Sequence, residues 1–304
     1  MKYWGWRSRQ RGPPRELKPP PKPDSSCIAA LLHGGKYQFF LYACVLGKRL
    51  QALDVEVDCV LLCGPGKFAD RRYYRTCLEQ CGWRLLRVDP IEASHLDRTP
   101  TKRHALVFTK LRVLELPYSK VLLLDLDILP RKGADVSKLL SVPAPAGKYH
   151  SSGMPDGPLP QHGEPIPDAL CEQGRWCPNA GVMRLDPLRT KEERRHQVAE
   201  MVQWIQSKYD ERQASFLPEQ YFLAEYFSNW HMIDVHWNWE VFPERATPKR
   251  HSSETAAAEK ARRESETWGW KVYYMASPSA PQTLNEAVDH AKANANVWHF
   301  CGMQ

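Results

Sequence analysis

The sequence predicts an α/β protein whose wound, mixed sheet is flanked by helices, as in Rossmann-like folds. Apolar runs typical of strands alternate with helical patterns over residues 27–124. The last of these strands lies in KVLLLDLDI, residues 120–128, where four consecutive apolar residues indicate a strand buried on both faces. A β-α-β-α-β-α-β order with such strands is typical of wound sheets with right-handed crossovers.

Each element of the first half has its own signal. The first strand ends in His33-Gly34-Gly35, a turn expected at the carboxyl end of a strand. Gly82 stops the second helix and Pro117 ends the third. The strands are expected at residues 27–32, 55–62, 83–88 and 120–124, and the helices at residues 37–50, 69–80 and 103–116.

The second half is less regular. Residues 143–178 contain eight prolines and predict a long irregular excursion. Residues 244–267 are polar with mixed charges and predict a solvated surface segment. Strands are expected at residues 181–185, 272–275 and 296–300, and helices at residues 191–208 and 219–227.

The positive charge is concentrated at one end of the sequence. The formal net charge is +7, and residues 1–24 supply +5 of it through seven Lys or Arg against Glu16 and Asp24. Residues 8–24 are also rich in proline, which favours an extended linker. We therefore expect a disordered tail over residues 1–24 and a single folded domain over residues 25–304. A basic tail on a nearly neutral body argues against a nucleic-acid partner.

The cysteines and the hydropathy pattern suggest a cytoplasmic protein. The nine cysteines (27, 44, 59, 63, 77, 81, 171, 177 and 301) form an odd number and lack the paired C-x2-C spacing of a zinc site. Reduced thiols are therefore expected. No apolar run approaches the roughly 20 residues of a membrane span, and the N-terminus lacks the core of a signal peptide.

Asp125 and Asp127 follow the buried strand directly. In extended chain, residues two apart point to the same side, so both carboxylates converge while Leu126 turns back to the protein. Ligands of wound sheets bind beyond the carboxyl ends of the strands. Two close carboxylates repel unless a cation lies between them, and oxygen ligands suit Mg, Mn or Ca. These residues predict half of a divalent-metal site, although the same tripeptide also occurs in helix caps and solvated loops.

Further motifs follow in order along the chain. They are Tyr118-Ser119-Lys120, Pro178-Asn179-Ala180-Gly181-Val182, Pro218-Glu219-Gln220 and Val297-Trp298-His299-Phe300-Cys301-Gly302. With Asp125-x-Asp127 between them, and with matches at residues 37–50 and Thr109-Lys110-Leu111, they resemble glycosyltransferase family 8, the family of glycogenin. The resemblance covers residues 27–304 and implies a GT-A nucleotide-diphospho-sugar transferase fold, making residues 25–304 one catalytic domain.

The resemblance also implies a metal centre and a reaction. Asp125, Asp127 and His299 would hold Mn²⁺, with Mg²⁺ as a second choice, because carboxylates with an imidazole favour Mn²⁺. The donor would be a UDP-sugar, and a hexose would be transferred with retention at the anomeric carbon. On its own residues, a histidine in a Trp-His-Phe strand such as His299 is more often a packed core side chain than a metal ligand.

The family pattern assigns the remaining site residues. Lys110 corresponds to a lysine near the donor sugar and phosphates, Asn179 and Gln220 to amides that bind sugar hydroxyls, and Glu219 to a position where the family usually carries Asp. Contacts to the nucleotide are assigned to His33, Tyr37, Leu126 and Gly302. Arg103 is a candidate partner of the diphosphate by its position.

Two other functions remain open at this point. A non-catalytic domain that binds a nucleotide-sugar is suggested by Glu219, whose carboxylate is one methylene longer than the family's. A haloacid-dehalogenase-like phosphatase also places Asp-x-Asp after a hydrophobic strand, but normally near the start of its domain. The acceptor could be a protein, a glycan, a lipid or a polyol, and a homodimer is left open.

Overall fold

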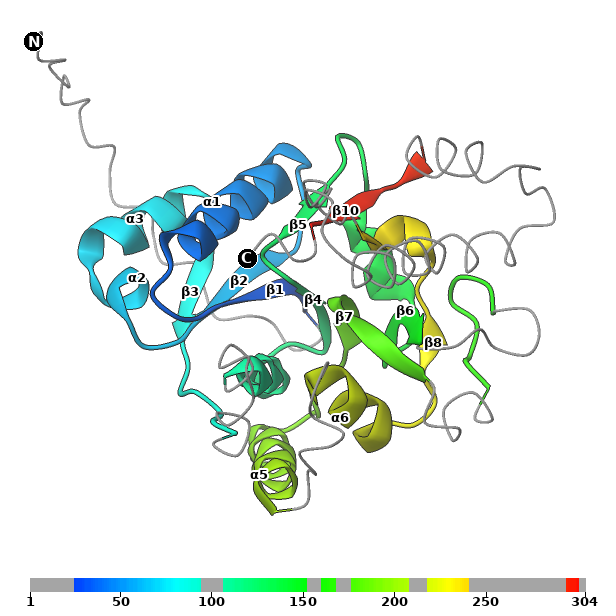
Figure 1. The fold of residues 1–304 in the computed structure, drawn as a ribbon. Helices are drawn as coiled ribbons and strands as arrows, with labels where there is room; N and C mark the ends of the chain where they lie inside the picture. Colours follow the sequence, from blue (N-terminus) through cyan, green and yellow to red (C-terminus); the bar gives the residue numbers. More distant parts are fainter. Residues whose placement is uncertain are drawn as a thin grey trace, which may run out of the picture.

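A computed structural model describes residues 25–93, 106–151, 160–167, 176–207, 218–240 and 294–300. Its main feature is a seven-stranded sheet with the order β3-β2-β1-β4-β7-β6-β8 (Figure 1). The strands are β1 (Ser26–Leu32), β2 (Asp58–Cys63), β3 (Arg84–Arg87), β4 (Lys120–Leu124), β6 (Ala146–Ser151), β7 (Trp176–Leu185) and β8 (His231–Met232).

The sheet is mixed, as the sequence predicts. The first four strands along the chain run parallel, with Cys27 of β1 opposite Asp58 of β2 and Val121 of β4. β7 then pairs antiparallel with β4, and β6 antiparallel with β7. The carboxyl ends of β1 and β4 therefore meet at one edge, where His33 and Asp125 follow their strands.

Helices cover both faces of this sheet. In Figure 1, α1, α2 and α3 lie on one side of the sheet and η3, α5 and α6 on the other. Their bounds are α1 (Tyr37–Ala52), α2 (Lys67–Asp70), α3 (Arg72–Gln80), η3 (Val107–Glu115), α5 (Lys191–Ser207) and α6 (Pro218–Tyr226), and two further 3-10 helices are η4 (Val136–Ser141) and η5 (Val235–Trp237).

The strands divide the core into two clusters because successive side chains point to opposite faces. In β4, Val121 and Leu123 pack with η3, α5 and α6, whereas Leu122 and Leu124 pack with α1 and α3. The next residue, Asp125, continues the alternation toward η3 and α6. The alternation of side chains along β4 therefore places Asp125 on the face of the sheet from which η3 and α6 supply charged side chains.

A second, three-stranded sheet has the order β5-β10-β9, and its strands are β5 (Ile128–Pro130), β9 (Trp239–Glu240) and β10 (Val297–His299). β10 pairs antiparallel with β5 and parallel with β9. It therefore lies between the segment that follows Asp127 and a segment from the middle of the second half.

Several sequence predictions need correction. The predicted excursion contains β6, a full strand of the main sheet, because its prolines flank the strand rather than interrupt it. The strand predicted at residues 181–185 is longer and begins at Trp176. The helix predicted over residues 103–116 is a 3-10 helix in its described part. The predicted strand at residues 272–275 and the insert at residues 244–267 lie outside the described residues.

The cysteines in the described ranges are all free thiols. Within these ranges, no helix is both long enough and apolar enough to cross a membrane.

Candidate active site

The two aspartates lie in a tight turn between β4 and β5. The Asp125 backbone N–H donates to the Gly181 carbonyl at 2.9 Å, which extends the pairing of β4 with β7 by one residue. The Ile128 N–H then donates to the Asp125 carbonyl at 3.3 Å and closes the turn. The extended geometry predicted for Asp-Leu-Asp is therefore wrong, because β4 ends at Leu124. The inward direction predicted for Leu126 is confirmed, since its exposed fraction is 9%.

His299 reaches this turn through the pairing of β10 with β5. In that antiparallel pair, His299 lies opposite Ile128, the residue after Asp127. The Phe300 N–H donates to the Asp127 carbonyl at 3.0 Å. As a result, His299 Nε2 lies 3.5 Å from Asp127 Oδ1, and both side chains are at most 10% exposed.

The geometry of Asp125, Asp127 and His299 fits a divalent cation. Each residue offers one ligand atom, and these atoms all lie within 4.8 Å of one another. Metal–oxygen bonds of about 2.0–2.6 Å put two ligands of one ion at most about 5 Å apart. Two carboxylates and an imidazole are a donor set that suits Mn²⁺. The three predicted ligands are thus brought together from two distant parts of the chain.

Lys110 links the acidic turn to α6. Its Nζ lies 2.7 Å from Asp125 Oδ1 and 3.5 Å from Glu219 Oε1, and its side chain is 12% exposed. Burial acts to lower the pKa of this ammonium, but the carboxylates of Asp125 and Glu219 outweigh it, so the pKa lies above its ordinary value. Lys110 therefore remains a cation beside the predicted metal ligands.

The residues predicted to contact the nucleotide differ in their surroundings. Burial and the charge of Lys110 lower the pKa of the His33 imidazole, and Asp125 acts in the opposite direction. Tyr37 lies in the first turn of α1 with its side chain half exposed, and its ring is 5.5 Å from that of Phe40.

Gln220 adjoins Glu219 on α6 and is 6% exposed. Its Oε1 atom is buried and has no hydrogen-bond partner among the described residues. Because an unpaired buried polar atom is costly, this amide is suited to a ligand that donates a hydrogen bond.

Asn179 is also buried, and its side chain bonds inside the protein. Its Oδ1 accepts a hydrogen bond from Asn238 and its Nδ2 donates to Glu240, which pairs in turn with Lys148. Asn238, Glu240 and Lys148 were not among the predicted site residues. The only hint was an asparagine between two tryptophans at residues 237–239, a pattern that favours burial of the amide. Arg103 and Gly302 lie outside the described residues.

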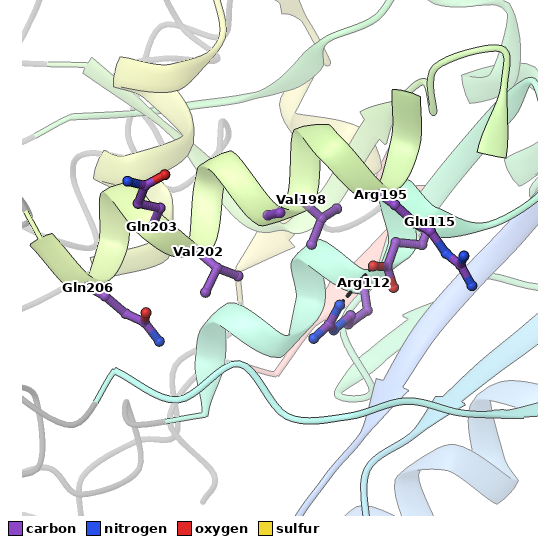
Figure 2. A pocket seen from close by; sticks show the side chains of 8 residues that line it. Arg112, Glu115, Arg195, Val198, Val202, Gln203 and Gln206 are labelled. Carbon is purple, nitrogen blue, oxygen red and sulfur yellow. Dashed lines mark hydrogen bonds and ion pairs between the residues drawn. The ribbon is translucent and has the colours of Figure 1, made fainter. Parts of the chain in front are cut away.

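A separate groove lies between η3 and α5 (Figure 2). Its volume is about 340 Å³, and an ion pair between Arg112 and Glu115, 2.7 Å long, spans part of its floor. The lining residues are Arg112, Glu115, Arg195, Val198, Ala199, Val202, Gln203 and Gln206. None of the predicted site residues that the structure describes lines this groove.

Two solved glycosyltransferases have folds similar to that of this chain. One is the galactosyltransferase LgtC with donor and acceptor sugar analogues, which is 18% identical, with 91% of this chain and 87% of that chain covered and a TM-score of 0.51. Another is the apo form of the glycosyltransferase GlyE of Streptococcus pneumoniae, which is 12% identical, with 93% of this chain and 55% of that chain covered and a TM-score of 0.53. The chain therefore has the GT-A fold.

Sequence comparison identifies the family. An uncharacterized protein of Acanthamoeba polyphaga mimivirus, R707, is 28% identical over 220 residues, which are 69% of this chain and 70% of that protein. The sequence model of glycosyl transferase family 8 matches residues 84–304, a range that includes both aspartates of the turn and His299. Because this match extends over most of the chain and over all three predicted metal ligands, the chain belongs to glycosyltransferase family 8.

Proposed function

We propose that this protein transfers a hexose from a UDP-sugar to an acceptor hydroxyl, with retention at the anomeric carbon and with Mn²⁺ in the site. The observation that carries the proposal is the convergence of Asp125, Asp127 and His299, whose ligand atoms lie within 4.8 Å of one another. Mg²⁺ is the second choice of ion, because it prefers an all-oxygen shell. When bound, the cation supplies positive charge to the diphosphate of the donor.

The chain's own residues supply the other positive charge. Lys110 is held beside Asp125 at 2.7 Å and keeps its proton, so its ammonium is available to the phosphates of the donor. This fixed charge would stabilise the leaving UDP without reorganisation during the reaction. Contacts of the nucleotide with His33, Tyr37, Arg103, Leu126 and Gly302 are proposed from the family resemblance.

The ion pair between Glu219 and Lys110 bears on how the anomeric configuration is retained. The two routes are attack by a protein carboxylate and displacement on the same face of the sugar. A carboxylate that lies 3.5 Å from the Lys110 ammonium is a weaker nucleophile than a free one. We therefore favour a same-face displacement, in which the departing phosphate helps to deprotonate the acceptor. In this scheme the unpaired Gln220 Oε1 accepts a hydrogen bond from a sugar hydroxyl, and Asn179 is a further candidate for such a contact.

The test is metal-dependent UDP release from a panel of UDP-sugars. The wild-type chain should release UDP from at least one UDP-hexose with Mn²⁺ and not with chelator. Asp127→Asn keeps the size of the side chain and removes its charge, so UDP release should fall ~100-fold or more while the melting temperature stays unchanged. Equal release by wild type and variant would remove the metal assignment.

The Lys110 ion pairs also favour a second candidate, a domain that binds a nucleotide-sugar without turnover. They engage the carboxylate of Asp125, a proposed metal ligand, and that of Glu219, the carboxylate that a double displacement would use. Calorimetric binding of UDP-sugar with no UDP release, with or without an added acceptor, would support this candidate. The membership in family 8 removes the phosphatase interpretation.

A further inference from the structure

A hydrogen-bonded network of largely buried polar side chains ends at the imidazole of His299. The exposed fractions are 3% for Lys148, 4% for Asn179, 0% for Asn238 and 7% for His299. The network begins with the Lys148 ammonium, which donates to one oxygen of Glu240. Asn179 Nδ2 donates to the other oxygen of Glu240 at 2.9 Å. Asn238 Nδ2 donates to Asn179 Oδ1 at 2.8 Å, and Asn238 Oδ1 lies 3.0 Å from His299 Nδ1.

The backbone fixes the direction of these hydrogen bonds. The Gly181 N–H lies 2.9 Å from Asn179 Oδ1, and because an N–H only donates, that side-chain atom must be oxygen. Asn238 must therefore present its NH₂ group to Asn179 and its oxygen to His299. A carboxylate at Glu240 requires the same orientation of Asn179 from the opposite end. The two ends of the hydrogen-bonded network thus require the same orientation of the Asn179 amide.

The result is a single allowed tautomer of neutral His299. An amide oxygen only accepts, so His299 Nδ1 must carry a hydrogen, and Nε2 is left with its lone pair. Nε2 is the ring nitrogen that lies 3.5 Å from Asp127 Oδ1. A metal-binding histidine needs this arrangement, with the second nitrogen donating to a fixed partner.

The packing around the ring fixes its position as well as its tautomer. A Cβ atom added at Gly181 would lie 2.4 Å from His299 Cε1 and 2.5 Å from Nδ1, so only glycine leaves room for the ring. At the far end, the Lys148 ammonium pairs with the carboxylate of Glu240, so each of these two largely buried groups has a charged partner. β10 lies between β5 and β9. The two pairings therefore hold His299 between Asp127, which precedes β5, and Asn238, which precedes β9.

We propose that Asn238 is a positioning residue, anchored through Asn179 to the Lys148–Glu240 ion pair, that holds His299 with its Nε2 lone pair toward the aspartates. This inference rests on the proposed function only in that a cation binds there. It also gives Asn179 a role that does not require contact with the sugar: its oxygen receives two internal hydrogen bonds, and one of its N–H groups is engaged by Glu240.

The first test needs neither metal nor substrate. In the full chain labelled with ¹⁵N-histidine, at about pH 8.5 where a free imidazole is neutral, nitrogen chemical shifts report which ring nitrogen is protonated. The His299 signals, identified by their loss in His299→Gln, should show a hydrogen on Nδ1 and none on Nε2. A hydrogen on Nε2 would overturn the inference.

The second test measures Mn²⁺ affinity of the same chains by titration, without a sugar donor. Asn238→Leu removes both hydrogen bonds and should weaken Mn²⁺ binding ~10–100-fold and lose the wild-type nitrogen pattern. Asn238→Asp keeps the acceptor for Nδ1 but places a carboxylate oxygen against Asn179 Oδ1, so it should keep the nitrogen pattern and recover only part of the affinity lost in Asn238→Leu. Unchanged affinity and pattern in Asn238→Leu would refute the positioning role. If the wild type binds no Mn²⁺ but shows Nδ1–H, the proposed metal site fails while the tautomer inference stands.

Discussion

The carboxylate of Asp125 has a cation beside it even without a metal, because Lys110 lies at 2.7 Å. A cation bound by Asp125, Asp127 and His299 would repel this ammonium. The repulsion is offset only when an anion lies between the two positive charges, as a diphosphate would. Metal and nucleotide should therefore bind cooperatively, each raising the affinity for the other.

At the same scale, His33 makes stability depend on pH. Burial and the Lys110 charge lower the pKa of its ring in the folded chain, whereas the unfolded chain has the ordinary value near ~6.5. Below that pH the unfolded chain binds more protons, so the free energy of unfolding falls as the pH drops.

We expect His33→Gln to flatten this acid decline in urea unfolding measured between about pH 7 and pH 5. His196→Gln, an exposed histidine on α5, is the matched control and should keep the wild-type slope. Parallel curves for wild type and His33→Gln would contradict the assignment.

The residues of the site differ in how visible they are in the sequence. Asp125 and Asp127 stand out because charged residues directly after a buried strand are expected either to have a function or to face solvent. Asn238 and Lys148 give no comparable signal, since their burial depends on partners far away in the chain. The sequence therefore points to the two aspartates, and the family resemblance adds His299, but neither indicates the residues that orient the imidazole.

At the scale of elements, η3 and α6 must pack together for Lys110 and Glu219 to meet. Phe108 of η3 and Phe222 of α6 are both fully buried, and their rings meet edge to face with centroids 5.7 Å apart. This contact joins the two elements on the side of the sheet to which Asp125 points.

Phe108→Ala should lower the free energy of unfolding by ~3–5 kcal/mol, because it removes a buried ring and leaves a cavity. Leu188→Ala, at a position 42% exposed, should change it by less than ~0.5 kcal/mol. Urea unfolding measures both. A similar small loss in the two variants would show that this aromatic contact does not hold η3 against α6.

Elements with strong local periodicity were predictable, and those defined by long-range pairing were not. α1 is visible from its buried residues at helical spacing, and the prediction of a helix there is confirmed. β9 has only two residues and β6 follows two prolines, so neither shows a strand pattern. They form because their backbones pair with β10 and β7.

At the scale of the molecule, residues 1–24 differ from the rest in composition. They supply most of the net charge and many prolines, and they lie outside the described residues. We expect that deleting them changes the melting temperature by less than about 2 °C, as for a change away from the core. UDP release should stay within about twofold of the full-length chain. A large fall in either measurement would show that this segment packs on the catalytic domain.

The small sheet also sets the order in which the three proposed metal ligands become available during synthesis. Residues 125–127 are synthesised long before His299, their imidazole partner on β10, which pairs with β5. During translation, the main sheet can assemble around β1, β2 and β4 while the cation site is still incomplete. A nascent chain can therefore pair these strands before the proposed ion ligands come together, so the ion proposed for this site would bind only after His299 has been added.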